Sequence, residues 1–90
     1  VAEDYPQLSM MSGLPVRIAV VFQPGTKAKP MWFELNHKQH KIARTTYYWK
    51  DRIGDAPLLH WAVVTEDETL YEIVFNSLDQ SWMLYPHKTE

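Results

Sequence analysis

The sequence predicts a small all-β domain, built as an antiparallel barrel or a strongly bent sheet of about six strands in meander order. The main observation is the stretch of residues 40–75, where three runs rich in aromatic and β-branched residues follow one another with polar breaks between them. Apolar and polar residues also alternate with a period of two, as in residues 71–75. No stretch carries a sustained helical period, so we expect no long helix.

The chain divides into a short N-terminal segment and one domain. Residues 1–15 are rich in Pro, Ser and Gly, and we expect a flexible tail there, followed by a single all-β domain over residues 16–90. The expected strands are residues 16–23, 31–35, 40–50, 58–65, 69–76 and 81–85. Pro24-Gly25 predicts a tight turn, residues 36–39 a hairpin tip and residues 50–57 a loop.

The predicted core follows from the alternation of apolar residues along these strands. Its expected members are Val16, Ile18, Val20, Phe22, Phe33, Leu35, Ile42, Leu59, Trp61, Val63, Tyr71, Ile73, Phe75, Trp82 and Leu84.

The composition narrows the class of protein. The 90 residues include no cysteine, which excludes disulfides and thiolate metal sites and fits a reducing compartment. No apolar run is long enough to cross a bilayer, and the N-terminus lacks the pattern of a signal peptide. We therefore expect a cytoplasmic protein without a membrane partner.

Candidate catalytic and metal-binding residues are few. His37 and His40 flank the expected hairpin tip, but a metal needs three or four converging ligands and the other histidines lie in separate strands. His60 is interpreted as a core or edge histidine with backbone partners. The sequence has neither a Gly-rich phosphate loop nor a Gly-x-Ser-x-Gly motif. We expect a binding module without a metal or cofactor, and not an enzyme.

The charges are unevenly distributed along the chain. Residues 26–52 hold seven Lys and Arg against two acidic residues, whereas residues 53–90 hold one Lys against seven acidic residues. Arg44 and Glu72 are a candidate ion pair if their strands are neighbours. The net charge of −2 thus combines a basic stripe with an acidic one.

Tyr47, Tyr48 and Trp49 interleave with the basic stripe. Small β-barrels bind single-stranded nucleic acid through cations that follow the phosphates and rings that stack on bases. The candidate nucleic-acid-binding residues are Lys38, Lys41, Arg44, Tyr48 and Lys50.

Two alternatives stay open. The Lys and Arg residues could simply solvate the outer face while Tyr47 and Trp49 fill the core. The opposed charge stripes also fit a module that forms a homodimer or docks on a protein partner through an edge strand.

Several motifs occur in a characteristic order: Pro-x-Trp-Phe, Tyr-x-Trp after a basic strand, Leu-Leu-His-Trp, Leu-Tyr-Glu-Ile and Trp-x-Leu. They lie in residues 30–35, 46–49, 58–63, 70–75 and 82–84. In this order the chain, from residue 16 onwards, resembles a family of small bacterial all-β domains of unknown function. Some similar domains belong to chains associated with Y-family DNA polymerase accessory genes, so the resemblance implies a link to DNA repair. It implies no catalytic residues.

Overall fold

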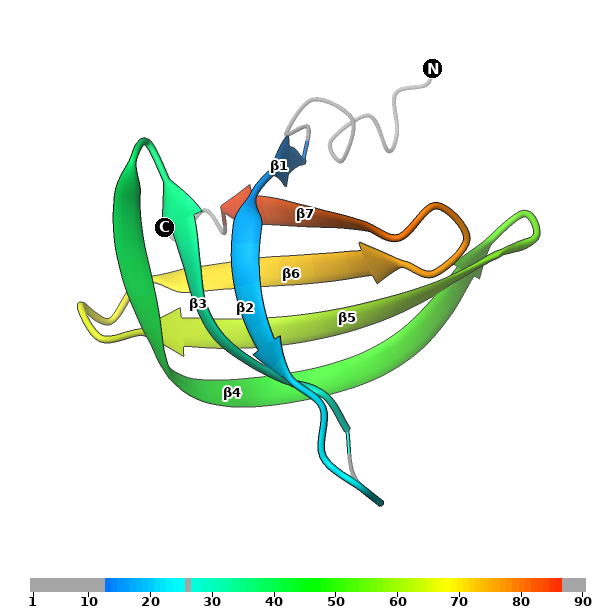
Figure 1. Cartoon of the computed structure of the whole chain (residues 1–90), viewed down its shortest axis with the longest axis horizontal. Helices are drawn as coiled ribbons and strands as arrows, with labels where there is room; N and C mark the ends of the chain where they lie inside the picture. Colours follow the sequence, from blue (N-terminus) through cyan, green and yellow to red (C-terminus); the bar gives the residue numbers. More distant parts are fainter. Residues whose placement is uncertain (1–12, 26, 87–90) are drawn as a thin grey trace.

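The computed structural model describes residues 13–25 and 27–86 (Figure 1). These residues form seven strands: β1 (Leu14–Pro15), β2 (Arg17–Val21), β3 (Lys29–Leu35), β4 (Lys38–Ile53), β5 (Ala56–Thr65), β6 (Leu70–Asn76) and β7 (Ser81–Pro86). The described part of the chain contains no helix, and hence none that is long and apolar enough to cross a membrane.

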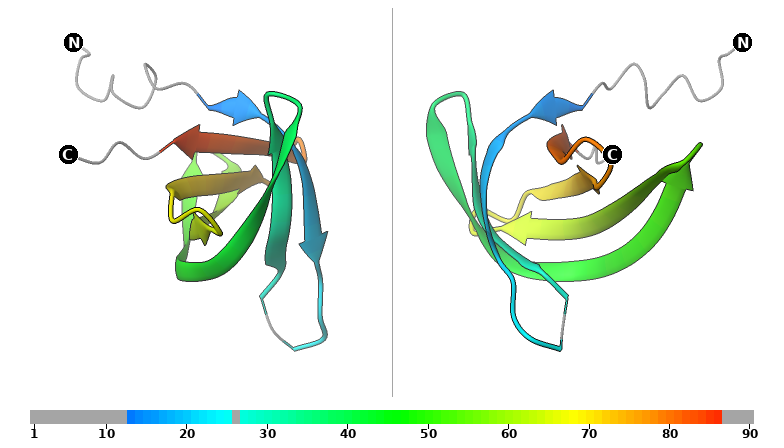
Figure 2. Two further views of the ribbon diagram at one scale, coloured as in Figure 1. Left: turned by 90° about the vertical axis from the view of Figure 1, so that its left-hand side faces the viewer. Right: turned by 45° about the vertical axis from the view of Figure 1, so that its right-hand side comes forward.

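The strands form one antiparallel sheet in the order β1-β7-β6-β5-β4-β3-β2. The sheet curls into a half-barrel, in which β2 and β3 run across the direction of β5, β6 and β7 (Figures 1 and 2). Although β1 and β2 stand at opposite ends of the strand order, only Val16 separates them in sequence, and its N–H donates to the Trp82 carbonyl at 3.4 Å. The predicted antiparallel barrel or strongly bent sheet is confirmed.

The strand count is seven instead of about six because Leu14 and Pro15 pair with β7. The sequence analysis placed both residues in the flexible tail. Their pairing depends on Leu84 and Met83, nearly 70 residues away, so nothing local in the sequence signals it. Residues 1–12 of the predicted tail lie outside the described residues.

Strand β4 belongs to both halves of the curl. Residues 38–41 pair with β3, and residues 42–53 pair with β5. The register shifts between Ile42 and Arg44 and again between Thr45 and Tyr47, which makes two β-bulges. Bulges bend a strand and increase its twist, and β4 curves visibly along this stretch (Figure 1).

The core lies on the concave side of the curl. Its most buried members are Phe33, Trp61, Val63, Tyr71, Ile73 and Leu84, all of which belong to the predicted core. Phe22, which the sequence analysis also placed in the core, does not lie there: its side chain is 74% exposed, because β2 ends at Val21 and the alternation does not extend to residue 22. Tyr48, which the sequence analysis placed at a surface, packs against the core instead.

The turns largely follow the predictions. Gly25 has a φ of 72°, as the second central residue of a Pro-Gly turn requires. Asn36 and His37 both have positive φ and form a two-residue hairpin turn. The predicted loop over residues 50–57 is wrong, because β4 and β5 continue pairing up to Ile53 and Ala56 and leave only Gly54 and Asp55 as the turn.

Candidate nucleic-acid interface

A groove opens where the sheet splits between β3 and β4. The two strands pair only from Leu35↔Lys38 to Trp32↔Lys41, and beyond that point β4 pairs with β5 alone. The gap between them is a groove of about 660 Å³, lined by Gln23 and residues 27–29 on one side and residues 43–48 on the other, with Trp61 below. This groove, called the 27–48 groove below, brings together two of the predicted site residues, Arg44 and Tyr48.

Two aromatic residues form the floor and inner wall of the 27–48 groove. Trp61 is buried, and its indole Nε1–H donates to the Ala28 carbonyl at 3.0 Å, which ties the start of β3 to the core. The Tyr48 ring centre lies 5.4 Å from that of Trp61. Lys27 Nζ covers the Tyr48 ring at 5.3 Å from its centre, a cation–π contact. Tyr48 is therefore part of the wall.

The charges along this groove are all positive. Lys27, Lys29 and Arg44 line it, and Lys50 lines an adjoining hollow with Gly25, Lys27 and Tyr48. None of the described lining residues is a carboxylate. Within residues 13–25 and 27–86, no ion pair involves Lys27, Lys29 or Lys50. Like charges gathered along a cleft focus the field there and attract counter-ions, whatever the net charge of the protein.

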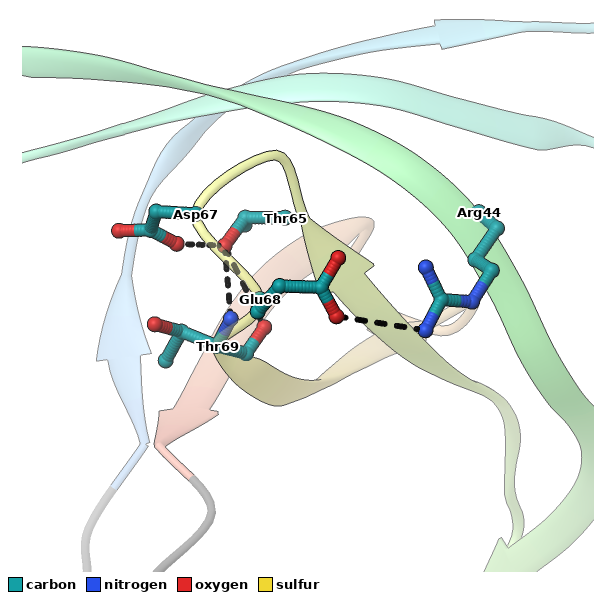
Figure 3. Close-up of polar contacts among 5 residues, drawn as sticks. All are labelled: Arg44, Thr65, Asp67, Glu68 and Thr69. Atoms are coloured by element: carbon teal, nitrogen blue, oxygen red, sulfur yellow. Dashed lines mark hydrogen bonds and ion pairs between the residues drawn. The ribbon is translucent and has the colours of Figure 1, made fainter.

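Arg44 has a carboxylate partner in the turn between β5 and β6. Its Nη2 lies 3.6 Å from Glu68 Oε1, and both side chains are exposed (Figure 3). The two strands expected to pair Arg44 with Glu72 are not neighbours, since β5 lies between β4 and β6. An exposed ion pair contributes about 0–1 kcal/mol. A polyanion in the groove can therefore replace Glu68 at little cost.

The turn that carries Glu68 is held by hydrogen bonds around Thr65. The Thr65 hydroxyl donates to the Asp67 carboxylate and accepts from Thr69 N–H at 3.4 Å (Figure 3). Glu68 N–H donates to the Thr65 carbonyl at 2.9 Å. Hydrogen bonds from the side chains of Thr65 and Thr69 lower the pKa of Asp67 below its ordinary value. Glu68 itself has a φ of 66°. The turn thus holds the Asp67 carboxylate in position.

The five predicted site residues fall into two groups. Arg44, Tyr48 and Lys50 border the 27–48 groove and its adjoining hollow. Lys38 and Lys41 line a separate groove of about 370 Å³, together with Glu66 and Asp67. We call this second site the 38–67 groove. The turn between β5 and β6, with Glu66, Asp67 and Glu68, lies beside these two lysines. Glu66 N–H donates to the Lys41 carbonyl at 3.0 Å.

The sequence analysis missed three residues of the 27–48 groove: Lys27, Lys29 and Tyr47. The two lysines follow the predicted Pro24-Gly25 turn. The sequence analysis did not consider that the segment between β2 and β3 could lie opposite β4 across a groove. Tyr47 could have been found by counting with a period of two from Ile42, a core residue, which puts residues 47 and 49 on the opposite face.

On that outer face three rings are layered. The ring centres of Tyr47 and Trp49 are 5.2 Å apart, and Trp49 stacks on His60 at 4.7 Å with an angle of 14° between the ring planes. His60 Nδ1 lies 2.7 Å from Glu72 Oε2, so the partner of this buried histidine is a carboxylate and not the backbone. Among the described residues His60 Nε2 has no hydrogen-bond partner, and it lies 3.9 Å from Asp51 Oδ2. In the described part of the chain, no three acidic, His or Cys residues are arranged to hold a metal ion.

No family model, curated protein or solved structure matches the chain. The resemblance to bacterial all-β domains therefore stays a prediction, and the function has to be argued from the geometry of the grooves.

Proposed function

We propose that this protein binds single-stranded nucleic acid in the 27–48 groove. The observation that supports the proposal is the set of cations around the groove, namely Lys27, Lys29, Arg44 and Lys50, without a carboxylate in its described lining. Phosphate contacts by Lys and Arg supply most of the non-specific affinity for nucleic acids. A cytoplasmic location, as expected from the sequence, belongs to the same proposal.

The size of the site suggests how such binding would depend on salt. Four cations that each neutralise one phosphate release condensed counter-ions, so the slope of log affinity against log salt is expected to be about −3 for a single strand. This is a modest slope, and it fits a module with weak to moderate affinity. It also makes binding easiest to detect at low ionic strength, where screening is weakest.

The test compares two double variants with the same change of charge. Lys27→Glu/Lys29→Glu alters the 27–48 groove, and Lys38→Glu/Lys41→Glu alters the 38–67 groove. Fluorescence anisotropy with a labelled single-stranded DNA of mixed sequence gives the affinity at low and moderate salt. We expect the first variant to lose at least tenfold in affinity and to flatten the salt slope, and the second to lose much less. Equal losses would mean that only net charge counts and would overturn the proposal.

A second candidate function follows from the free edge of β4. Within the described part of the chain, residues 43–53 pair with β5 on one side only, and Tyr47 and Ile53 expose 65% and 68% of their surface there. An unpaired edge is a template for another strand, although Lys50, Asp51 and Arg52 on this edge oppose unselective pairing. In this alternative the protein forms a homodimer or docks on a protein partner. Sedimentation at high concentration tests it: a dimer that Ile53→Lys abolishes would support it, and a monomer throughout would remove the homodimer.

A further inference from the structure

Tyr47 stands out among the aromatic residues next to the 27–48 groove. It lines the groove, and its side chain is 65% exposed, whereas Trp61 is buried and Tyr48 is half-buried beneath Lys27. Tyr47 therefore combines two properties: an exposed aromatic ring, and a place in the lining beside Lys27, Lys29 and Arg44.

The position of Tyr47 is fixed by its neighbours. The bulge at Thr46 precedes it, and the Thr46 hydroxyl donates to the Ala62 carbonyl at 3.2 Å, which holds the bulge against β5. Tyr47 lies opposite Ala62 in the sheet and packs on Trp49. Bulges commonly re-aim a side chain next to a functional site. Here Tyr47 follows the bulge, borders the groove and lies on the same face of the sheet as Trp49.

The rings behind Tyr47 form a support. Trp49 stacks on His60, its cross-strand partner, and Glu72 holds the far side of the imidazole at 2.7 Å. Tyr47 is therefore the outermost of three layered rings on β4 and β5, and Glu72 on β6 contacts the innermost one. A ring that is already ordered loses little conformational entropy when a ligand stacks on it.

We propose that Tyr47 is a stacking platform for one unpaired base, and that it makes the 27–48 groove selective for single strands over duplex. This inference rests on the proposed function. In a duplex both faces of each base are covered by neighbouring base pairs, so none is available to Tyr47. In a single strand a base turns out of the chain while Lys29 and Arg44, which line the same groove, contact the adjacent phosphates. Stacking of this kind tolerates any base sequence.

The experiment measures the affinity of the full chain for three labelled probes of equal length: a single-stranded oligoadenylate DNA, an abasic single strand and a DNA duplex. The variants are Tyr47→Phe, which keeps an aromatic ring, and Tyr47→Leu, which keeps apolar bulk without one. Leu78→Ala serves as the matched control, because Leu78 is equally exposed but lies in the turn between β6 and β7. Urea unfolding checks that all variants are folded.

We expect the wild-type protein and Tyr47→Phe to bind oligoadenylate about tenfold more tightly than the abasic strand. Tyr47→Leu should lose this preference and keep its affinity for the abasic strand, and Leu78→Ala should behave as wild type. Equal affinity of the wild-type protein for the oligoadenylate and abasic strands would overturn the inference and leave the proposed function standing. A protein that binds none of the probes at low salt would overturn both. A Tyr47→Leu variant that changes the oligomeric state but not the preference would assign Tyr47 to a protein interface instead.

Discussion

Two grooves border β4, and they differ in net charge although the strand carries cations along both. In the 27–48 groove Lys27, Lys29 and Arg44 have no carboxylate among their described neighbours in the lining. In the 38–67 groove Lys38 and Lys41 face Glu66 and Asp67. The difference arises from topology, because the β5–β6 turn returns the acidic stretch of the sequence to one end of β4 and not to its middle. A run of Lys and Arg in a sequence thus becomes a binding surface only where the fold keeps acidic residues away.

The largest expected effect comes from replacing Trp61, which forms the floor of the 27–48 groove. Trp61→Phe removes part of a buried side chain and the hydrogen bond to Ala28, so the free energy of unfolding should fall by about 2–3 kcal/mol. Because the start of β3 loses its tie to the core, oligonucleotide affinity should fall as well under conditions where the variant is fully folded. Urea denaturation and anisotropy measure the two effects.

Trp32→Phe is the control, since Trp32 is half-buried and lies outside both grooves. A Trp61→Phe variant that is destabilised but binds as wild type would show that the geometry of the 27–48 groove does not depend on its floor.

A smaller effect is expected when Glu68, the carboxylate that pairs with Arg44 of the 27–48 groove, is neutralised. Glu68→Gln releases Arg44 from its exposed ion pair, and affinity for single-stranded DNA should rise by up to about fivefold at low salt. Glu34→Gln makes the same change of charge at a carboxylate that pairs with Arg17 at 2.9 Å, outside the groove, and should raise affinity less. Identical gains would indicate a response to net charge alone and would weaken the contrast between the grooves.

The fold was predictable because its determinants are local and periodic. The alternation along β6 and the aromatic and β-branched runs of β4 and β5 predict these three strands. The six most buried residues, on β3, β5, β6 and β7, all belong to the core predicted from alternation along the chain. The pairing of Leu14 and Pro15 with β7 was not predictable, because it depends on contacts with the far end of the chain. The same applies to the continuous β4–β5 hairpin, where a two-residue turn replaces the expected loop.

The candidate site was predictable only in part, for a related reason. Arg44 and Lys50 were found because they lie on a strand with obvious charge, whereas Lys27 lies in the β2–β3 loop and Lys29 at the start of β3. Plain alternation from Ile42 would place Arg44 inside; the bulge at Ala43 turns it outward, opposite Val64. Lys38 and Lys41 were included because the sequence does not show that the acidic turn lies beside them. Which charged side chains lie close together across a sheet depends on the strand order and on where the turns lie.

The smallest expected effect concerns the turn that gives the 38–67 groove its carboxylates. Hydrogen bonds from Thr65 and Thr69 hold the pKa of Asp67 below its ordinary value, so the folded state favours the ionised carboxylate. The stability from this preference is fully present above the ordinary pKa of about 3.8 and is lost as pH falls through the lowered folded pKa. Asp67→Asn should therefore be less stable than wild type at neutral pH and lose less stability on acidification.

Urea unfolding at a series of pH values between neutral and strongly acidic conditions measures this, with Glu66→Gln as a control that removes a charge from the same turn but leaves the hydrogen bond to Thr65 intact. If Asp67→Asn and wild type lose stability in parallel below pH 4, the hydrogen bonds around Thr65 do not favour the ionised carboxylate. The carboxylates of the 38–67 groove would then lie beside Lys38 and Lys41 because of the position of the turn alone. The contrast between the two grooves would become a consequence of strand order, with no contribution from the local chemistry of the turn.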